Sequence, residues 1–454
     1  VKDVLIMTAP NSGAGVLSFL KGWGVMPSAI LFVLLYTKLS NIVNRERLFY
    51  GIVVVFIAFF GLFAFSLYPN RELIHPSLET IQALQTEYPN FKWIFPIYGV
   101  WTYSLFYVLA ELWGSVMISL LFWQFANDIT RTEEAKRFYA MFGLIANVAL
   151  IISGTTVEYF SEIKDKLPPE VDAWGYSLNY MMGAAVVCGI AAIALYWWVT
   201  EYILTDPRFY DAAAPKNKKE KKSKPKLSVG DSFKLIFSSP YIGYIAVLVL
   251  AYGVSINLIE VVWKDQLKQA FPNPNDYGAF MGKFSRATGI VTMLLIWFTK
   301  GIVRKFGWFT GAIVTPAVLI ITGALFFAFV LFKDELTPLV AGMGLTATLM
   351  ATYIGAIQNI LSKGTKYSNF DPTKEMAYIP LDQELKVKGK AAVDVIGGRL
   401  GKAGGGYVQQ GLLIATAGDI MTIAPYLAGV VGVVVGAWVV AVKGLSKRYN
   451  ALVK

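Results

Sequence analysis

The chain has 454 residues, of which 56% are hydrophobic and only 16% are charged, with a mean hydropathy of +0.52. A soluble domain carries about a quarter charged residues, so this composition excludes a soluble protein. The net charge is +11, but the lysines and arginines lie mainly between apolar runs and not on one continuous face, which excludes a nucleic-acid binder. Cys188 is the only cysteine, and we expect no disulfide, no metal and no cofactor.

Apolar runs long enough to cross a bilayer as helices recur from one end of the chain to the other. They cover residues 14–38, 49–67, 93–126, 137–160, 176–204, 236–262, 277–299, 308–332, 338–361, 391–416 and 421–442. Residues 2–10 are expected to be the end of a first helix that is truncated in this numbering. The sequence therefore predicts an all-α integral membrane protein with twelve helices.

A polar segment, residues 206–231, divides these helices into two groups of six. Its dense lysine run, Lys216–Lys226, cannot bury an apolar face, which predicts a solvated linker. We expect an N-terminal six-helix bundle at residues 1–205 and a C-terminal six-helix bundle at residues 232–454. Basic loops share one side with the linker, and the positive-inside pattern places the linker and both termini in the cytoplasm.

The two halves share residues at an offset of 262, including types that are rare inside membranes. The identical pairs are Lys2/Lys264, Asp3/Asp265, Leu5/Leu267, Lys21/Lys283, Thr37/Thr299 and Lys38/Lys300. This repeat predicts that a six-helix unit was duplicated. Because order and helix parity are kept, the halves should be related by an axis along the membrane normal, as in the major facilitator architecture. Substrate is then expected between them near the midplane.

Several charged residues fall inside the apolar runs, where an ionised side chain costs about 2.5 to 3.5 kcal/mol even on the lenient insertion scale. The cations are Lys21, Lys283 and Arg286, and the acids are Glu111 and Glu260. Such groups line a polar path or pair with one another, and snorkelling or structural ion pairs are the alternative to a substrate role. The excess of cations favours a polyanionic substrate.

A glycine-rich run near residue 400 places two more cations, Arg399 and Lys402, three residues apart on one helix face. Glycines at every fourth position let this helix approach another helix or a ligand closely. The run is not a phosphate-binding loop, because Ile396 replaces the first required glycine and Ala403 replaces the hydroxyl that holds magnesium. Without such a loop the sequence offers no site for nucleotide hydrolysis, so transport is expected to run on gradients or exchange.

Asn147 is a lone amide in an apolar run, and it can both donate and accept hydrogen bonds as an adenine edge requires. Hydrogen bonding between helices is the alternative role.

Long strings of residues resemble the ATP/ADP translocases of plastids and intracellular bacteria over nearly the whole chain. They are Leu35–Asn41, Ala110–Ser115, Leu121–Asn127, Ser255–Lys264, Asp371–Pro380 and Val387–Ala391. The resemblance implies a twelve-helix antiporter that imports ATP in exchange for ADP, with phosphate able to accompany the ADP. Position by position, the family's transport-critical charges match Lys21, Glu111, Glu260 and Lys402, whereas the triplet 397–399 departs from the plastid pattern.

We therefore predict a secondary active transporter, not an enzyme, whose two bundles give alternating access to ATP and ADP. The predicted substrate ligands are Lys21, Asn147, Lys283, Arg286, Arg399 and Lys402. Glu111 and Glu260 are assigned to gating, and are expected to pair with Lys21, Lys283 or Lys402 when substrate is absent.

Two kinds of alternative stay open at this point. One is a transporter of another nucleotide, NAD or an organic phosphate, and the other is a polytopic membrane enzyme. The expected partners are ATP, ADP, phosphate and membrane lipids. We expect a monomer in a bacterial inner membrane rather than a plastid inner envelope.

Overall fold

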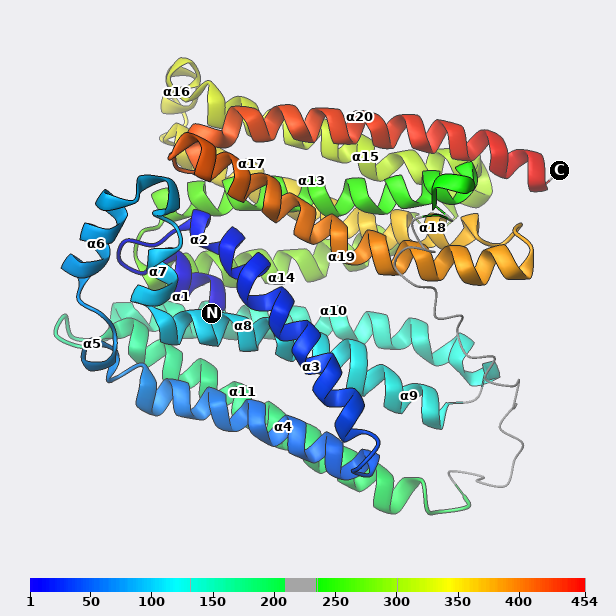
Figure 1. The fold of residues 1–454 in the computed structure, drawn as a ribbon, viewed down its shortest axis with the longest axis horizontal. Coiled ribbons are helices and arrows are strands. Elements are labelled where there is room, and N and C mark those ends of the chain that lie inside the picture. The colour runs from blue at the N-terminus through cyan, green and yellow to red at the C-terminus, as the bar shows by residue number, and fades with distance from the viewer. Residues whose placement is uncertain (131, 209–233, 235, 300, 454) are drawn as a thin grey trace.

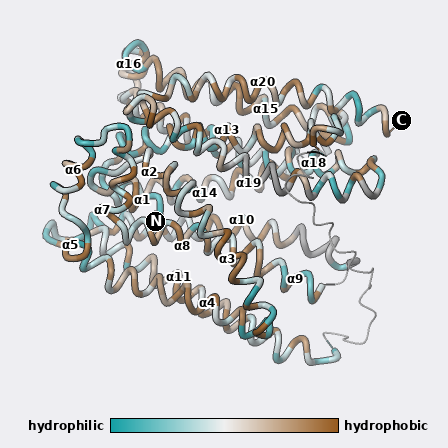
Figure 2. Tube along the Cα trace, in the orientation of Figure 1, coloured by the Kyte–Doolittle hydropathy of each residue, from teal (hydrophilic) through white to brown (hydrophobic). Residues whose placement is uncertain are grey.

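The computed structural model describes residues 1–130, 132–208, 234, 236–299 and 301–453, so residues 209–231 of the predicted linker lie outside it. Every regular element in this described part is helical, and nine helical runs are long and apolar enough to cross a membrane. The long helices run roughly side by side (Figure 1). Apolar residues follow their length, and hydrophilic residues gather toward their two ends (Figure 2). This is the arrangement that a membrane-spanning bundle requires.

The first half of the chain begins with a broken helix and ends with the helix that leads to the linker. Its elements are α1 (Lys2–Thr8), α2 (Ala14–Phe19), η1 (Leu20–Val25), α3 (Met26–Leu39), α4 (Arg45–Leu62), η2 (Phe63–Leu67), α5 (Arg71–Ile74), α6 (Leu78–Glu87), η3 (Pro89–Phe91), α7 (Phe95–Gly99), α8 (Trp101–Gly114), η4 (Ser115–Phe122), α9 (Trp123–Ile129), α10 (Thr132–Glu162), η5 (Ile163–Lys166), α11 (Ala173–Trp198) and η6 (Val199–Ile203).

The second half also consists mainly of long helices. Its elements are α13 (Pro240–Ala270), α14 (Pro274–Thr299), α15 (Ile302–Leu331), α16 (Lys333–Ala341), α17 (Ala347–Thr365), η7 (Lys366–Phe370), α18 (Asp371–Ala377), α19 (Gln383–Thr416) and α20 (Ile420–Val453). The break between α13 and α14 corresponds to the break between α1 and α2, as the offset of the repeat predicts.

Each of the eleven predicted spans overlaps a helix or a run of helices, although several helices extend beyond the predicted bounds and two of the apolar runs contain a break in the helix. The span predicted at 93–126 begins at Trp101, because Val100 leaves the helical conformation between α7 and α8. The span predicted at 338–361 is divided between α16 and α17, because the turn between them places Gly344 at a φ of +71°. Only glycine adopts this left-handed conformation without strain, so the helix ends there.

The two halves meet along two seams. In the first seam α10 packs against α14, and in the second α2 and η1 pack against α19. Counted in the order of the predicted spans, with α1 as the first, these pairs are helix 5 with helix 8 and helix 2 with helix 11. Adding or subtracting six converts one pair into the other. The two seams therefore occupy equivalent places in the predicted order of spans.

At the α10–α14 seam the two helices touch backbone to backbone. A Cβ atom at Gly154 would lie 2.6 Å from the backbone nitrogen of Arg286, and one at Gly282 would lie 2.5 Å from that of Glu158. Neither distance leaves room for a side chain. Glycines at both positions therefore allow the close approach of the two halves.

Replacing Gly282 with valine should separate α10 from α14 and lower the stability of the protein by about 1 to 3 kcal/mol, the usual range for overpacking. The matched control is Gly183→Val on α11, where an added Cβ meets no atom within 4 Å. Thermal unfolding of the two detergent-purified variants checks this expectation. Equal melting temperatures would contradict it.

The halves are also bridged at the end of the bundle that carries α6, here called the α6 end. The Asn90 Nδ2 atom donates to the Ile414 carbonyl at 2.7 Å, and the Trp93 Nε1 atom donates to the Gly418 carbonyl at 3.0 Å. The ring of Trp93 also covers Gly15, where a Cβ would lie 2.4 Å from it. In this conformation the segment around η3 thus connects the first half to the α19–α20 turn.

Candidate functional site

Five charged side chains from three helices meet between the two halves, and we call them the charge cluster. They are Lys2 and Asp3 of α1, Glu111 of α8, and Glu260 and Lys264 of α13. The Lys2 Nζ atom lies 2.9 Å from Glu111 Oε1, and the Lys264 Nζ atom lies 3.1 Å from Glu260 Oε1. Asp3 lies between the lysines, 3.4 Å from Lys2 Nζ and 3.2 Å from Lys264 Nζ.

Local helix geometry explains how these side chains converge. Glu260 and Lys264 are one turn apart on α13 and therefore share a face. Glu111 lies in the last turn of α8, directly before the π-helical segment η4. Such wide turns change the direction of the following side chains and are frequent at functional sites. The Lys2 ammonium also lies 4.8 Å from the ring centroid of Tyr107, a second favourable contact for this cation.

The cluster is stable only because its charges are paired. The Lys264 side chain is 3% exposed and that of Asp3 is 15% exposed. An isolated ion at this depth would lose far more hydration energy than a protein can replace, whereas direct pairs offset much of that loss. With two lysines and three acids, all ionised, the cluster carries one net negative charge. It therefore has one fewer cation than it needs for neutrality.

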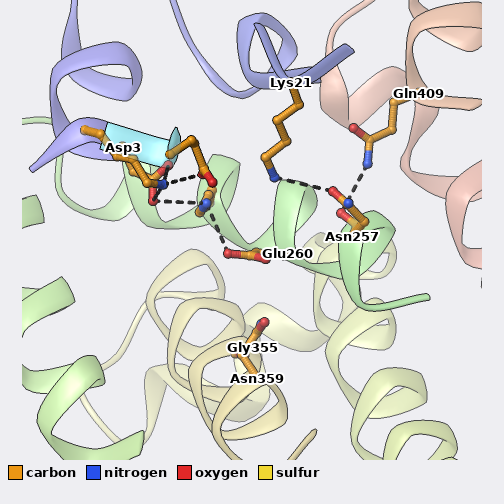
Figure 3. Close-up of polar contacts among 10 residues, drawn as sticks. Asp3, Lys21, Asn257, Glu260, Gly355, Asn359 and Gln409 are labelled. Atoms are coloured by element: carbon orange, nitrogen blue, oxygen red, sulfur yellow. Dashed lines mark hydrogen bonds and ion pairs between the residues drawn. The ribbon is translucent and has the colours of Figure 1, made fainter. Parts of the chain in front are cut away.

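Lys21 supplies a further cation beside the cluster. It lies on the π-helical segment η1, and its Nζ atom donates to Asn257 Oδ1 at 3.4 Å. The Gln409 Nε2 atom on α19 donates to the Asn257 carbonyl at 3.1 Å. In Figure 3 Lys21 points into the space between Asp3 and Gln409, toward α13. The predicted cation Lys21 is therefore brought to the same region as Glu111 and Glu260.

Lys283 and Arg286 are brought to a different place. Both lie on α14 at the α10–α14 seam, where they bind acids of α10. The Lys283 Nζ atom lies 2.8 Å from Glu162 Oε1, and the Arg286 Nη1 atom lies 2.5 Å from Glu158 Oε2. For these two cations the structure favours the structural ion pair that the sequence left open as the alternative to substrate binding.

Asn147 also lies at the α10–α14 seam. Its Nδ2 atom donates to the Gly143 carbonyl at 2.9 Å, one turn back on the same helix. The backbone carbonyl oxygen of Asn147 would lie 2.9 Å from a Cβ atom added at Gly289 of α14. This placement favours helix packing over contact with a base.

We therefore expect Asn147→Ala to leave the ratio of ATP to GTP uptake unchanged, while both rates shift together. Competition of unlabelled GTP against labelled ATP uptake measures that ratio. A preference for ATP that narrows selectively would instead assign Asn147 to the base.

The side chains of the last two predicted cations, Arg399 and Lys402, lie outside the described residues, although both positions fall within the helix α19.

Among the described side chains, the ion pairs of the two acids are with lysines other than Lys21 and Lys283, and the expected pairing with Lys402 lies outside the described residues. Glu111 binds Lys2, and Glu260 binds Lys264, whereas Lys283 binds Glu162. The sequence did contain a signal for the missed lysines. Lys2 and Lys264 form one identical pair of the internal repeat, and the acids Asp3 and Asp265 directly after them form another. Charged residues are rare inside the apolar runs of this chain, so two adjacent repeated pairs are a signal.

Comparison with known proteins decides the family. The family described as "TLC ATP/ADP transporter" matches residues 1–449. The chain belongs to the TLC ATP/ADP transporter family. Membership excludes the alternative of a polytopic membrane enzyme, because this family consists of transporters. No solved structure matches the chain.

Relatives of this TLC family member come from bacteria and from plastids. ADP,ATP carrier protein 1 of Chlamydia trachomatis is 51% identical over 454 residues, covering 99% of this chain and 85% of the relative. A chloroplastic ADP,ATP carrier protein 1 of Arabidopsis thaliana is 49% identical over 451 residues, covering 99% and 71%. ADP,ATP carrier protein 1 of Rickettsia bellii is 46% identical over 455 residues, covering 100% and 90%. The predicted family resemblance is thereby confirmed.

Proposed function

We propose that this chain imports ATP in exchange for ADP across a membrane by alternating access. Family membership and the carrier names of its relatives support ATP and ADP as the substrates. Exchange of ATP for ADP alone moves net charge, because ATP carries one more negative charge than ADP. Phosphate that leaves with the ADP would balance this difference.

The two seams support a transporter built from two six-helix bundles, residues 1–205 and 232–454. Rocking of one bundle against the other opens one end of the central region and closes the opposite end. Both seams and the bridges of Asn90 and Trp93 cross from one half to the other. Those bridges must break before the α6 end can open. By the positive-inside pattern this end faces away from the cytoplasm. We propose a bacterial inner membrane as the membrane in which the protein lies.

The observation that carries the mechanism is the ion pair between Asp3 and Lys264, at 3.2 Å, which joins the two halves inside the charge cluster. Phosphate oxygens accept strong hydrogen bonds from lysines. Substrate phosphates that bind Lys2, Lys264 and Lys21 would compete with the acids that pair with Lys2 and Lys264. Binding of nucleotide therefore changes the contacts between the halves, which is what couples a substrate to a conformational change.

Proteoliposomes test the proposal directly. Vesicles loaded with ADP should take up labelled ATP much faster than empty vesicles, and labelled phosphate loaded with the ADP should leave during uptake. ATP uptake that is independent of internal ADP would contradict exchange. Retained phosphate would contradict only its co-transport.

Lys21→Ala should raise the KM for ATP about tenfold with little loss of folded protein, since one charge-assisted hydrogen bond contributes about 1.5 kcal/mol. Lys38→Ala is the matched control, because Lys38 is exposed at the far end of the same helical arm. Initial uptake rates over a range of ATP concentrations give the KM of each variant. An unchanged KM in the Lys21 variant would remove this residue from the substrate site.

A further inference from the structure

A cavity of about 800 Å³ opens at the α10–α14 seam, apart from the charge cluster. Its walls come from the end of α10, from η5, and from α14 and α17, so both halves of the protein contribute. Lys164, Asp276 and Lys283 line one part of it, and Phe284, Ile357 and Ile360 line another. The cavity therefore has a charged part and an apolar part.

This cavity lies on the outer surface of the bundle. On α17 its lining side chains Tyr353 and Ile357 are 43% and 53% exposed. Gly355 points to nearly the opposite side of the same helix, because two residues correspond to about 200° of rotation. A Cβ at Gly355 would lie 2.3 Å from Trp263 of α13, so that side is buried inside the second half. Large exposed side chains on a spanning helix face lipid.

The charged part of the cavity is balanced. Lys283 pairs with Glu162 at 2.8 Å, and Lys164 of η5 pairs with Asp276 in the first turn of α14. Lys283 and Glu162 are both about half exposed, so a ligand can reach them. Glu162 and Asp276 lie where α10 stops and α14 starts, and Lys283 lies in the third turn of α14, whereas Ile357 and Ile360 lie in the second half of α17. The sequence of charged, aromatic and apolar walls follows the profile of a lipid leaflet.

We propose that this cavity binds the headgroup of phosphatidylethanolamine, with the acyl chains lying along Ile357 and Ile360. The lipid phosphate accepts hydrogen bonds from Lys283 and Lys164, and the primary ammonium donates to Glu162 and Asp276. A free polyanion would meet two carboxylates here without a cation of its own. A choline headgroup has no N–H to donate, so it cannot replace the ethanolamine group at Glu162.

The position of this lipid gives it influence over the transport cycle. Its headgroup would contact α10 from one half and α14 from the other, and would hold the seam in the geometry seen here. Ligands that bind one conformation stabilise it in proportion to their occupancy. The inference does not rest on the proposed function, because lipid binding is measurable without transport.

Native mass spectrometry of the purified full chain, titrated with phosphatidylethanolamine or phosphatidylcholine in detergent, tests the proposal. Ala287→Trp fills the cavity, and Ala324→Trp places the same side chain on the exposed surface of α15 as a matched control. We expect phosphatidylethanolamine to bind about tenfold more weakly to the first variant and equally to the second. Equal binding by both variants would overturn the site.

A second variant, Glu162→Gln, tests the headgroup chemistry without changing the shape of the cavity. It should abolish the preference for phosphatidylethanolamine over phosphatidylcholine, because the lipid ammonium loses its carboxylate partner. If Ala287→Trp does not fold, this second variant decides whether the site exists. A preference equal to that of the parent protein would overturn the headgroup assignment. Displacement of the bound lipid by millimolar inorganic phosphate would show a phosphate site instead and would also reject the proposal.

Discussion

Replacing Lys264 with methionine is expected to abolish ATP/ADP exchange and to lower the stability of the protein. Lys264 is 3% exposed and holds both Asp3 and Glu260 within 3.2 Å. Methionine fills a similar volume but leaves two carboxylates facing each other without this cation. Removing one partner of a buried ion pair costs about 3 to 5 kcal/mol, because the remaining charge is buried unpaired.

Thermal unfolding in detergent and uptake into ADP-loaded vesicles measure the two effects separately. Lys447→Met, at an exposed position on α20, controls for the loss of a lysine in general. The double variant Lys264→Met/Glu260→Gln should regain part of the lost stability but no exchange activity, because it removes the charge of Glu260, whereas Asp3 keeps Lys2 as a partner. A single Lys264→Met variant with the parental melting temperature would show that the pairs of the charge cluster do not hold the halves together.

Hydrophobic runs predicted the long helices well, because the membrane requires an apolar stretch of known length whatever the contacts between helices. The errors arise where local backbone geometry interrupts such a run. Val100 and Gly344 end helices inside stretches that remain apolar. Hydropathy alone cannot detect a turn of this kind, since its signal is a dihedral angle and not a change of composition.

The sequence indicates which charged residues lie deep in the membrane, but not which helix each side chain points toward. Lys21 and Lys283 occupy equivalent positions of the repeat, yet Lys21 meets Asn257 and Lys283 meets Glu162. The duplicated helices are alike, but the helices that face them at each seam are not, since α13 and α19 present amides beside Lys21 and α10 presents acids to Lys283. Partner identity depends on the other half of the protein, which a single sequence does not reveal.

The same limit explains why Lys2 was missed. Its position near the start of a short apolar stub gave no indication of depth, and only its repeat partner Lys264 connected it to the interior. In the structure the two repeat-related lysines converge, each with one acid, around Asp3. Internal symmetry was thus a better guide to the charge cluster than the cost of burying each charge by itself.

The second large effect is expected at Glu111 and Glu260. Glu111→Gln and Glu260→Gln should each slow exchange at least about tenfold while ATP binding is kept or strengthened, because loss of one carboxylate removes both a repulsion for phosphate and a competitor for a lysine. Without that competitor, Lys2 or Lys264 stays with the nucleotide, and release becomes the slow step. Glu→Asp variants should also slow exchange, because the shorter side chain cannot keep the 2.9 Å and 3.1 Å contacts.

The readout that separates this role from a structural one is the split between binding and turnover. ATP affinity measured by equilibrium binding should hold or rise in both Gln variants as the maximal exchange rate falls, whereas a packing defect would lower the melting temperature and the affinity together. Because Glu111 belongs to one half and Glu260 to the other, the double variant tests whether they act on the same step. If each Gln variant exchanges nucleotide at the parental rate in sealed vesicles, the acids are only partners that keep two buried lysines ionised, and the coupling must come from elsewhere in the protein.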